Sequence, residues 1–295
     1  MKLARRIGGI AGRPTSGRRR LATIPIYQID AFTSRPFHGN PAAVCPLDKW
    51  LDDEVLQAVA MENNLSETAF TVPHEDGYKL RWFTPTTEVD LCGHATLATA
   101  SLILERLEPH REEVAFETKS GRLQVRKGAN GQLTMDFPVW PVSEACTPSK
   151  DLVDAMGARP CSSFKIPEQH GGPYFLFEYA TVDEILHLNP ATDRMKANVV
   201  ATAAVDASAP KDLADVDFVC RFFGPISGIP EDPVTGSAHC TLAPFWADRL
   251  GKNPLKSVQV SARRGELLVE VCSTGRVFIS GSCAFYLEGK VTLPE

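Results

Sequence analysis

Two short stretches of the chain each combine acidic side chains, a glycine and a polar residue just before a helix-like run. Their key residues are Glu88, Gly93 and His94 in the first stretch, and Glu231, Asp232, Gly236 and Ser237 in the second. Glycine permits a tight backbone turn, and the free N–H groups at a helix N-terminus attract anions. The two stretches therefore predict two helix N-termini that could bind an anionic group, such as the carboxylate of a small substrate.

The second stretch repeats the first, which indicates an internal duplication. Gly236-Ser237-Ala238 aligns with Gly93-His94-Ala95, and each stretch follows a strand-like run. The residues after His94 are small or apolar on every face, as in a helix that is buried all round. A repeat of this size predicts two similar lobes, each with its own buried helix.

Composition excludes several classes of function. Of the 295 residues, 43% are hydrophobic and 23% charged, which is typical of a soluble globular protein. The net charge of -5 gives no reason to expect nucleic acid or an anionic membrane as a partner. No apolar run approaches the roughly 20 residues of a membrane span. The 8 cysteines show no CxxC pair and no Cys/His metal spacing, so we predict reduced thiols and no metal site.

Residues 1–23 differ in kind from the rest of the chain. They contain lysine and arginine but no acidic residue, with Ser, Thr and Gly between. This composition resembles a mitochondrial or plastid transit peptide, but a disordered basic tail or a misplaced start codon would look the same. We exclude the segment from the fold. The predicted location is cytoplasmic, or mitochondrial or plastid if the leader is genuine.

The remaining pattern predicts an α+β protein with more strands than helices. Prolines at 138 and 141 indicate a boundary between an N-terminal lobe, residues 24–138, and a C-terminal lobe, residues 139–295. Helices are expected at 51–63, 150–156 and 181–188, the last with a capping box formed by Thr181 and Glu184. There is no GxGxxG after a strand and no Walker loop, which argues against dinucleotide and ATP binding.

Five motifs in order resemble those of the PhzF family of phenazine-biosynthesis-like isomerases, whose relatives include the MAWD-binding protein. The motifs are Phe37-His-Gly-Asn-Pro41, Ser66-Glu-Thr-Ala-Phe70, Arg81-Trp-Phe-Thr-Pro85, Glu88-Val-Asp-Leu-Cys-Gly-His-Ala-Thr96 and Glu231-Asp-Pro-Val-Thr-Gly-Ser-Ala238. The resemblance covers the chain from about Ile24 to the C-terminus and leaves out the basic leader.

The resemblance implies a diaminopimelate-epimerase-like fold, with two lobes of matching topology, each a curved and mostly antiparallel sheet around a central helix. It implies an active site between the lobes, no metal or organic cofactor, and a homodimer. The family's catalytic carboxylate falls on Glu67, which by itself reads as an ordinary solvated acid. The other site residues that the resemblance implies are His94, Asp232 and Ser237, with Gly93, Ala95, Gly236 and Ala238 around the substrate.

The implied reaction moves a proton between two carbons of a small carboxylate-bearing substrate without redox chemistry. A carboxyl group can take the proton from one carbon and return it to another near neutral pH if burial raises its pKa. The remaining polar side chains would hold the substrate and stabilise charge as it develops. Read without the resemblance, His94 could simply start a helix, and Ser237 could be an ordinary N-cap.

Two alternatives stay open. A racemase or epimerase of the same fold would use one cysteine from each lobe, and Cys92 stands directly before Gly93. The matching residue before Gly236 is Thr235, whose hydroxyl is far too weak an acid to replace a thiol. The other alternative is a protein without catalytic activity that binds another protein, as the resemblance to the MAWD-binding protein implies.

Overall fold

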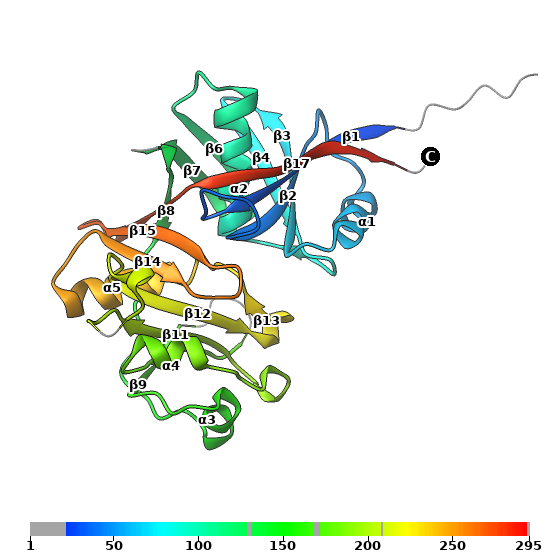
Figure 1. Cartoon of the computed structure of the whole chain (residues 1–295). Helices are drawn as coiled ribbons and strands as arrows, with labels where there is room; N and C mark the ends of the chain where they lie inside the picture. Colours follow the sequence, from blue (N-terminus) through cyan, green and yellow to red (C-terminus); the bar gives the residue numbers. More distant parts are fainter. Residues whose placement is uncertain (1–21, 129–130, 168–171, 208, 294–295) are drawn as a thin grey trace, which may run out of the picture.

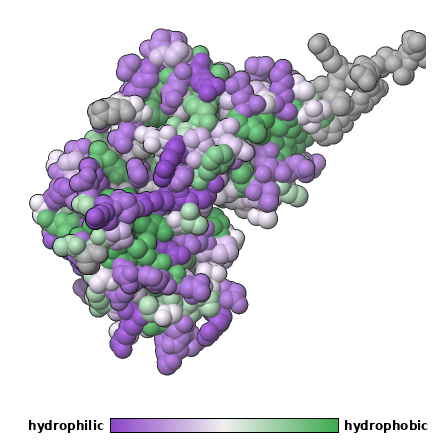
Figure 2. All heavy atoms as spheres, in the orientation of Figure 1, coloured by the Kyte–Doolittle hydropathy of each residue, from purple (hydrophilic) through white to green (hydrophobic). Residues whose placement is uncertain are grey.

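The computed structural model describes residues 22–128, 131–167, 172–207 and 209–293, so nearly all of the basic segment 1–23 lies outside it. The described chain forms two lobes that lie one above the other in Figure 1. On the face shown in Figure 2, hydrophilic and hydrophobic residues alternate over both lobes, and the outline narrows where the lobes meet. No helix among the described residues is long and apolar enough to cross a membrane.

The first lobe contains most of the first half of the chain. Its elements are β1 (Thr23–Ala31), β2 (Asn40–Pro46), α1 (Asp53–Asn63), β3 (Glu67–His74), β4 (Gly77–Phe83), β5 (Glu88–Val89), α2 (Gly93–Leu102), β6 (Glu113–Thr118), β7 (Gly121–Lys127) and β8 (Leu133–Pro138). Strands β2 and β3 are parallel and joined through α1, and β4 and β6 are parallel and joined through α2. The other strand pairs of this lobe are antiparallel.

The second lobe repeats this order. Its elements are α3 (Lys150–Met156), β9 (Ser162–Ile166), β10 (Tyr174–Glu178), α4 (Val182–His187), β11 (Asn198–Ala204), β12 (Phe218–Gly224), β13 (Ile229–Asp232), α5 (His239–Leu250), β14 (Leu255–Gln259), β15 (Gly265–Val271) and β16 (Arg276–Gly281). The parallel pairs are again two, β10 with β11 around α4, and β12 with β14 around α5. The matching topology agrees with the duplication indicated by the sequence.

Each lobe is organised around one helix. Every residue of α2 from His94 to Leu102 is buried, which confirms the expectation from its composition. Helix α5 is buried along its first two thirds, from His239 to Trp246 with Pro244 partly covered, and its last residues are exposed. Because both helices lie inside curved sheets, their N-terminal ends are fixed by packing on several sides rather than by local capping.

Strands also join the lobes. Strand β16 pairs with β8 of the first lobe, and the last strand, β17 (Cys283–Thr292), pairs with β1 over its whole length. The sequence boundary at residue 138 places β17 in the second lobe, whereas its backbone hydrogen bonds place it in the first. Strand pairing between the two ends of a chain leaves no trace in local composition, so the sequence could not indicate that β17 pairs with β1.

The helices expected at 51–63, 150–156 and 181–188 are present within two residues of those bounds, and the capping box of Thr181 and Glu184 is confirmed. Three strands were missed, namely the two-residue strand β5, β9 and β13. Strand β9 is short and begins with two serines, and β13 has the sequence Ile-Pro-Glu-Asp, which reads as a turn. Both exist because a neighbouring strand supplies hydrogen-bond partners, β10 for β9 and β12 for β13.

Candidate active site

The two glycine turns meet at the junction of the lobes. A Cβ atom added to Gly93 would lie 3.7 Å from the Cα of Gly236, and one added to Gly236 would lie 3.8 Å from the Cα of Gly93. Gly93 is the first residue of α2, and Gly236 belongs to the turn that precedes α5. The main chains at Gly93 and Gly236 are therefore so close that any side chain at either position would fill the space between the two helix starts.

Glu67 and His94 lie side by side next to this junction. Glu67 is the first residue of β3, and its Oε2 is 3.1 Å from Nε2 of His94, the second residue of α2. The two side chains are only 11% and 7% exposed. Within the described chain, neither of these two atoms meets the geometric criteria for a hydrogen bond with any partner. Buried polar atoms usually have partners, so this pair is poised to bind a third group.

The opposite nitrogen of the His94 ring faces two other side chains. Its Nδ1 lies 3.2 Å from Nδ2 of Asn40 and 3.5 Å from Sγ of Cys92. Burial lowers the pKa of His94, but Cys92 and Glu67 raise it more, and the pKa lies well above its usual value. Negative charge beside a buried imidazole favours its charged form, which is the physical reason for the upward direction of the His94 pKa.

Asp232 enters the site from the second lobe, at the end of β13. Its Oδ1 accepts a hydrogen bond of 2.8 Å from Nδ2 of Asn40, and its Oδ2 accepts one from the hydroxyl of Thr235. Burial raises the pKa of Asp232 to about 6, against the opposing effects of His94 and the hydrogen bonds. This carboxyl group therefore changes its protonation state within the range in which acid–base catalysts work.

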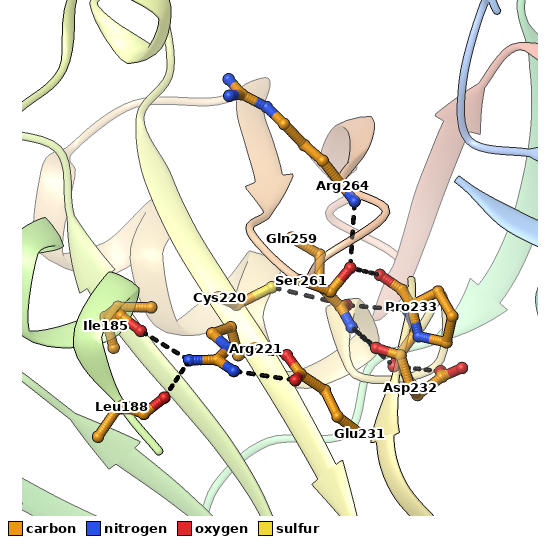
Figure 3. A network of polar contacts seen from close by, with 11 residues as sticks. Ile185, Leu188, Cys220, Arg221, Glu231, Asp232, Pro233, Gln259, Ser261 and Arg264 are labelled. Carbon is orange, nitrogen blue, oxygen red and sulfur yellow. Dashed lines mark hydrogen bonds and ion pairs between the residues drawn. The ribbon is translucent and has the colours of Figure 1, made fainter. Parts of the chain in front are cut away.

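Gln259 supports Asp232 from the neighbouring strand β14. Its Nε2 donates to the main-chain oxygen of Asp232 at 2.7 Å, and its Oε1 accepts from the main-chain N–H of Thr235 at 2.9 Å. Figure 3 shows this contact beside the ion pair of Arg221 with Glu231 on β12 and β13. The turn that precedes Gly236 is thus held rigidly on its own lobe.

Ser237 lies beside Gly236 and is partly exposed. Its main-chain nitrogen would be 4.0 Å from a Cβ atom added to Gly93, so it adjoins the junction. Within the described residues its side chain makes no hydrogen bond to Glu67, His94 or Asp232. It is not the N-cap of α5 either, since that position is Ala238, without a side-chain cap.

The structure therefore brings Glu67, His94 and Asp232 into one buried group, with Ser237 at its edge. Ala95 follows His94 in the first turn of α2, and Ala238 directly precedes α5, so both small residues lie next to the glycine turns. The members that sequence reasoning missed are Asn40 and Gln259. Asn40 lies in the first of the five motifs and could have been found there, whereas Gln259 has no local signal.

Glu88 and Glu231 are ion-paired in the same way, each at the edge of its own lobe. Arg81 of β4 donates to both oxygens of Glu88, at 2.7 and 3.0 Å, and Arg221 of β12 donates to both oxygens of Glu231, at 2.7 and 2.9 Å. Bidentate pairs of this kind fix geometry as well as charge. These two acids therefore hold the strands that lead into the glycine turns.

Oxygen, sulfur and nitrogen atoms of Glu67, Cys92 and His94 lie within 4.8 Å of one another, a spacing that three metal ligands could have. The arrangement fits a metal poorly. Cys92 contacts Nδ1 of the ring and Glu67 lies at Nε2, so a metal ion bound to either nitrogen would have one of the other two ligands behind the ring. Burial also raises the pKa of Cys92 to about 11, whereas zinc binds the thiolate.

The sequence profile of the family "Phenazine biosynthesis-like protein" matches residues 29–289. A protein of Pseudomonas aeruginosa named as an uncharacterized isomerase is 47% identical over 270 residues, which are 92% of this chain and 99% of that protein. The crystal structure of a PhzF family protein from Enterococcus faecalis superposes with a TM-score of 0.82 at 38% identity and covers 92% of this chain and 100% of its own.

A more distant match concerns the fold alone. The crystal structure of a hydroxyproline epimerase from Agrobacterium vitis superposes with a TM-score of 0.56 at 13% identity, over 91% of each chain. The chain described here thus belongs to the PhzF family and has the epimerase-like α+β fold that its sequence predicted.

Proposed function

We propose that the protein is an isomerase that moves a proton between two carbons of a small substrate carrying a carboxylate, with Glu67 as general acid and base. The observation that carries this proposal is the buried contact of Glu67 with His94, in which the two facing atoms have no hydrogen-bond partner within the described chain. The isomerase name of the Pseudomonas aeruginosa relative supports the reaction class.

The proposed reaction has two proton transfers. In the first, a carbon–hydrogen bond of the substrate breaks, Glu67 takes the proton, and the electron pair shifts along the conjugated carbons. In the second, the same carboxyl group returns the proton to another carbon, and a new carbon–hydrogen bond forms. No electrons enter or leave, so the reaction needs no redox cofactor, and the substrate alone supplies the atoms.

Groups around Glu67 suit the two other requirements of such a reaction, which are stabilisation of the developing charge and binding of the substrate carboxylate. His94 and Asp232 can stabilise the charge that develops when the carbon is deprotonated. The N–H groups at the start of α2 and before α5, beside Gly93 and Gly236, can bind the substrate carboxylate, and Ser237 adjoins them. Since Glu67 and His94 are almost fully covered, entry of a substrate requires the lobes to move apart.

A thiol-dependent racemase is less well supported. Its first base would be Cys92, whose pKa burial raises to about 11, so the thiol is neutral at physiological pH. Its second base would have to stand at Thr235, where the hydroxyl donates to Asp232. Cys240 lies further along, inside α5, and burial raises its pKa to about 12.

Deuterium exchange tests the proposal. The protein is incubated in heavy water with a panel of small unsaturated or β,γ-functionalised carboxylic acids, and deuterium in each acid is measured by mass spectrometry. We expect incorporation at carbon with at least one member of the panel, and its loss in Glu67→Gln. Exchange that survives in Glu67→Gln but is lost in Cys92→Ser would establish the thiol mechanism instead.

The third possibility, a binding protein without activity, has its own outcome in the same experiment. Absence of exchange with every acid, in protein whose fold is confirmed by circular dichroism, would reject the isomerase proposal.

Addition of EDTA tests whether the exchange depends on a metal ion. We expect no change in the exchange rate, since none of the proposed steps uses a metal ion.

A further inference from the structure

Asn40 is the residue that joins the acid–base pair of the first lobe to the acid of the second. It is fully buried, at the first position of β2. Its side-chain nitrogen lies 2.8 Å from Oδ1 of Asp232, 2.9 Å from the main-chain oxygen of Val234 and 3.2 Å from Nδ1 of His94. The first two contacts cross between the lobes and the third stays within one lobe.

The second lobe determines which way the Asn40 amide points. A carbonyl oxygen can only accept hydrogen bonds, and so can an ionised carboxylate. The oxygens of Asp232 and Val234 therefore require the NH₂ group to face them, and not the amide oxygen. Consistently, Oδ1 of Asn40 faces away and has no hydrogen-bond partner among the described residues. The orientation of this amide is thus fixed by the acceptors that face it.

The fixed NH₂ group has a consequence for His94. The two hydrogens of the NH₂ group are accepted by Asp232 and Val234, and its nitrogen accepts no hydrogen bond. A hydrogen on the ring nitrogen 3.2 Å away would therefore point at a group that cannot accept it, and is disfavoured. A neutral ring has one hydrogen, on Nδ1 or on Nε2, and the neighbours of each nitrogen decide which. With Nδ1 disfavoured, the hydrogen lies on Nε2, which is the nitrogen beside Glu67.

We propose that Asn40 is a positioning residue that keeps the single hydrogen of the neutral His94 ring on Nε2, the nitrogen beside Glu67, and that it does so only while the second lobe holds its amide in place. Contact between the lobes therefore sets the tautomer of the catalytic histidine. When the lobes part, Asn40 loses Asp232 and Val234, its amide can rotate, and the preference for Nε2 is removed. The neutral ring then has a single preferred tautomer only in the closed site.

The competing arrangement is defined by Cys92. Its sulfur lies 3.5 Å from Nδ1 of His94, and it could accept a hydrogen from that nitrogen if Asn40 did not disfavour it. Sulfur is a weak acceptor, so the NH₂ group of Asn40 prevails over it. Without Asn40, the hydrogen would be shared between Nδ1 and Nε2.

Nitrogen-15 NMR of the ring tests this directly. The full-length protein is labelled with ¹⁵N-histidine, and the signals of His94 are identified among those of the seven histidines by their absence in His94→Gln. The spectrum is followed to a pH above the titration of His94, where the ring is neutral. We expect Nε2 to carry the hydrogen in the wild-type protein. A hydrogen on Nδ1 would overturn the proposal without any variant being needed.

Variants sharpen the result. Asn40→Ala should change the neutral ring from one tautomer to a mixture, and Asn40→Asp should transfer the hydrogen to Nδ1, because a carboxylate accepts it. The matched control is Asn198→Ala, since Asn198 is also a buried asparagine at the first position of a strand, and its amide donates to Ser227 at 2.9 Å. The His94 signals should be unchanged in this control. Unchanged signals in Asn40→Ala would contradict the proposal.

The inference concerns the role of a residue in the site proposed above, but its readout does not depend on activity. If the ring shows the expected tautomer and no acid exchanges deuterium, the positioning role stands and the isomerase proposal fails. If exchange occurs and the tautomer is on Nδ1, the isomerase proposal stands and the role of Asn40 is rejected.

Discussion

The first and second lobes hold their glycine turns with the same framework. In each lobe, an arginine two residues before a phenylalanine forms a bidentate pair with a glutamate five residues before the glycine. The guanidinium groups of Arg81 and Arg221 lie 5.1 and 4.9 Å from the rings of Phe83 and Phe223. Polar contacts of this kind recur only when the backbone around them recurs, so the duplication extends to individual side chains.

The residues placed on this framework differ between the lobes. The first lobe contributes Glu67 and His94, which are in contact with each other, whereas the second contributes Asp232 and Ser237, which are not. Asp232 is held by hydrogen bonds from both lobes, and Ser237 is partly exposed. Under the proposed function, this difference corresponds to a division of labour, in which the first lobe would transfer the proton and the second would position the substrate and balance charge.

The largest effect should come from removing the acid of the first lobe. Glu67→Gln should reduce the deuterium exchange rate by roughly 10²- to 10⁴-fold, the usual contribution of a general acid or base. Ser237→Ala should reduce it only about tenfold, the effect of one hydrogen bond in the transition state. Glu62→Gln, on the exposed surface of α1, is the control. Equal losses in Glu67→Gln and Ser237→Ala would refute the division of labour.

The second prediction concerns the pH dependence of stability and Asp232. Its pKa is raised from 3.8 to about 6 in the folded chain, so the folded state binds this proton more tightly than the unfolded state. The contribution to stability is therefore complete below about pH 4 and is lost as the pH rises through about 6. The shift corresponds to about 3 kcal/mol.

Urea denaturation between pH 4 and pH 7 measures this loss. The free energy of unfolding of the wild-type protein should fall by about 2 kcal/mol more than that of Asp232→Asn, which has no proton to lose. Part of the full effect is already lost at pH 4, where the unfolded carboxyl group is about half ionised. Asp248→Asn, on the exposed end of α5, should follow the wild type. Parallel curves for the wild type and Asp232→Asn would show that Asp232 does not titrate in this range.

The third prediction distinguishes the two glycine turns. A methyl group at Gly236 would lie 3.3 Å from the ring of Phe32, which is completely buried and also packs against Gly281. Because that ring cannot easily move, Gly236→Ala should lower the free energy of unfolding by about 1–3 kcal/mol. A methyl group at Gly93 meets nothing closer than 3.7 Å, so Gly93→Ala should change stability by less than about 1 kcal/mol.

The loss of exchange activity in Gly236→Ala and Gly93→Ala should not parallel their loss of stability. Both methyl groups enter the space between the helix starts, where we place the substrate carboxylate, so both variants should lose exchange activity. Thermal unfolding and deuterium exchange measured on the same samples would separate the two effects. Full activity in Gly93→Ala would show that the substrate does not approach this turn.

The smallest effect is expected at Cys92. Its thiol is buried and its pKa is raised to about 11, so it contributes packing and a weak contact to His94 rather than a base. Cys92→Ser should therefore retain the exchange rate within about threefold, and Cys92→Ser combined with Thr235→Cys should gain nothing. An increase in racemisation of any acid in the Thr235→Cys single variant would instead favour the thiol mechanism.

Local patterns were sufficient for much of the fold. The residue pattern predicted that strands outnumber helices, and the uniform apolar character after His94 predicted a helix buried all round, because periodicity reflects how an element is covered. Local patterns failed for β13, where the segment Ile229–Asp232 contains a proline and two acids. That strand depends on pairing with β12, and it is the strand that places Asp232 in the site.

The candidate site was predictable only where its residues carry a local signal in the sequence. The residue types at Gly93, His94 and Gly236 signal helix starts through their own spacing, and the motif resemblance singled out Glu67. Nothing in the sequence indicated that Asn40 contacts Asp232, 192 positions away. Such a contact depends on the register in which the lobes meet.

The sequence by itself determined the two turns, the helices that follow them and the family to which the chain belongs, because each of these depends on neighbouring residues. Only the tertiary structure decided that β17 returns to β1 and that a single amide nitrogen lies between His94 and Asp232. Hydrogen bonds between distant segments require exact relative placement, and that placement results from packing of the whole core rather than from any local pattern.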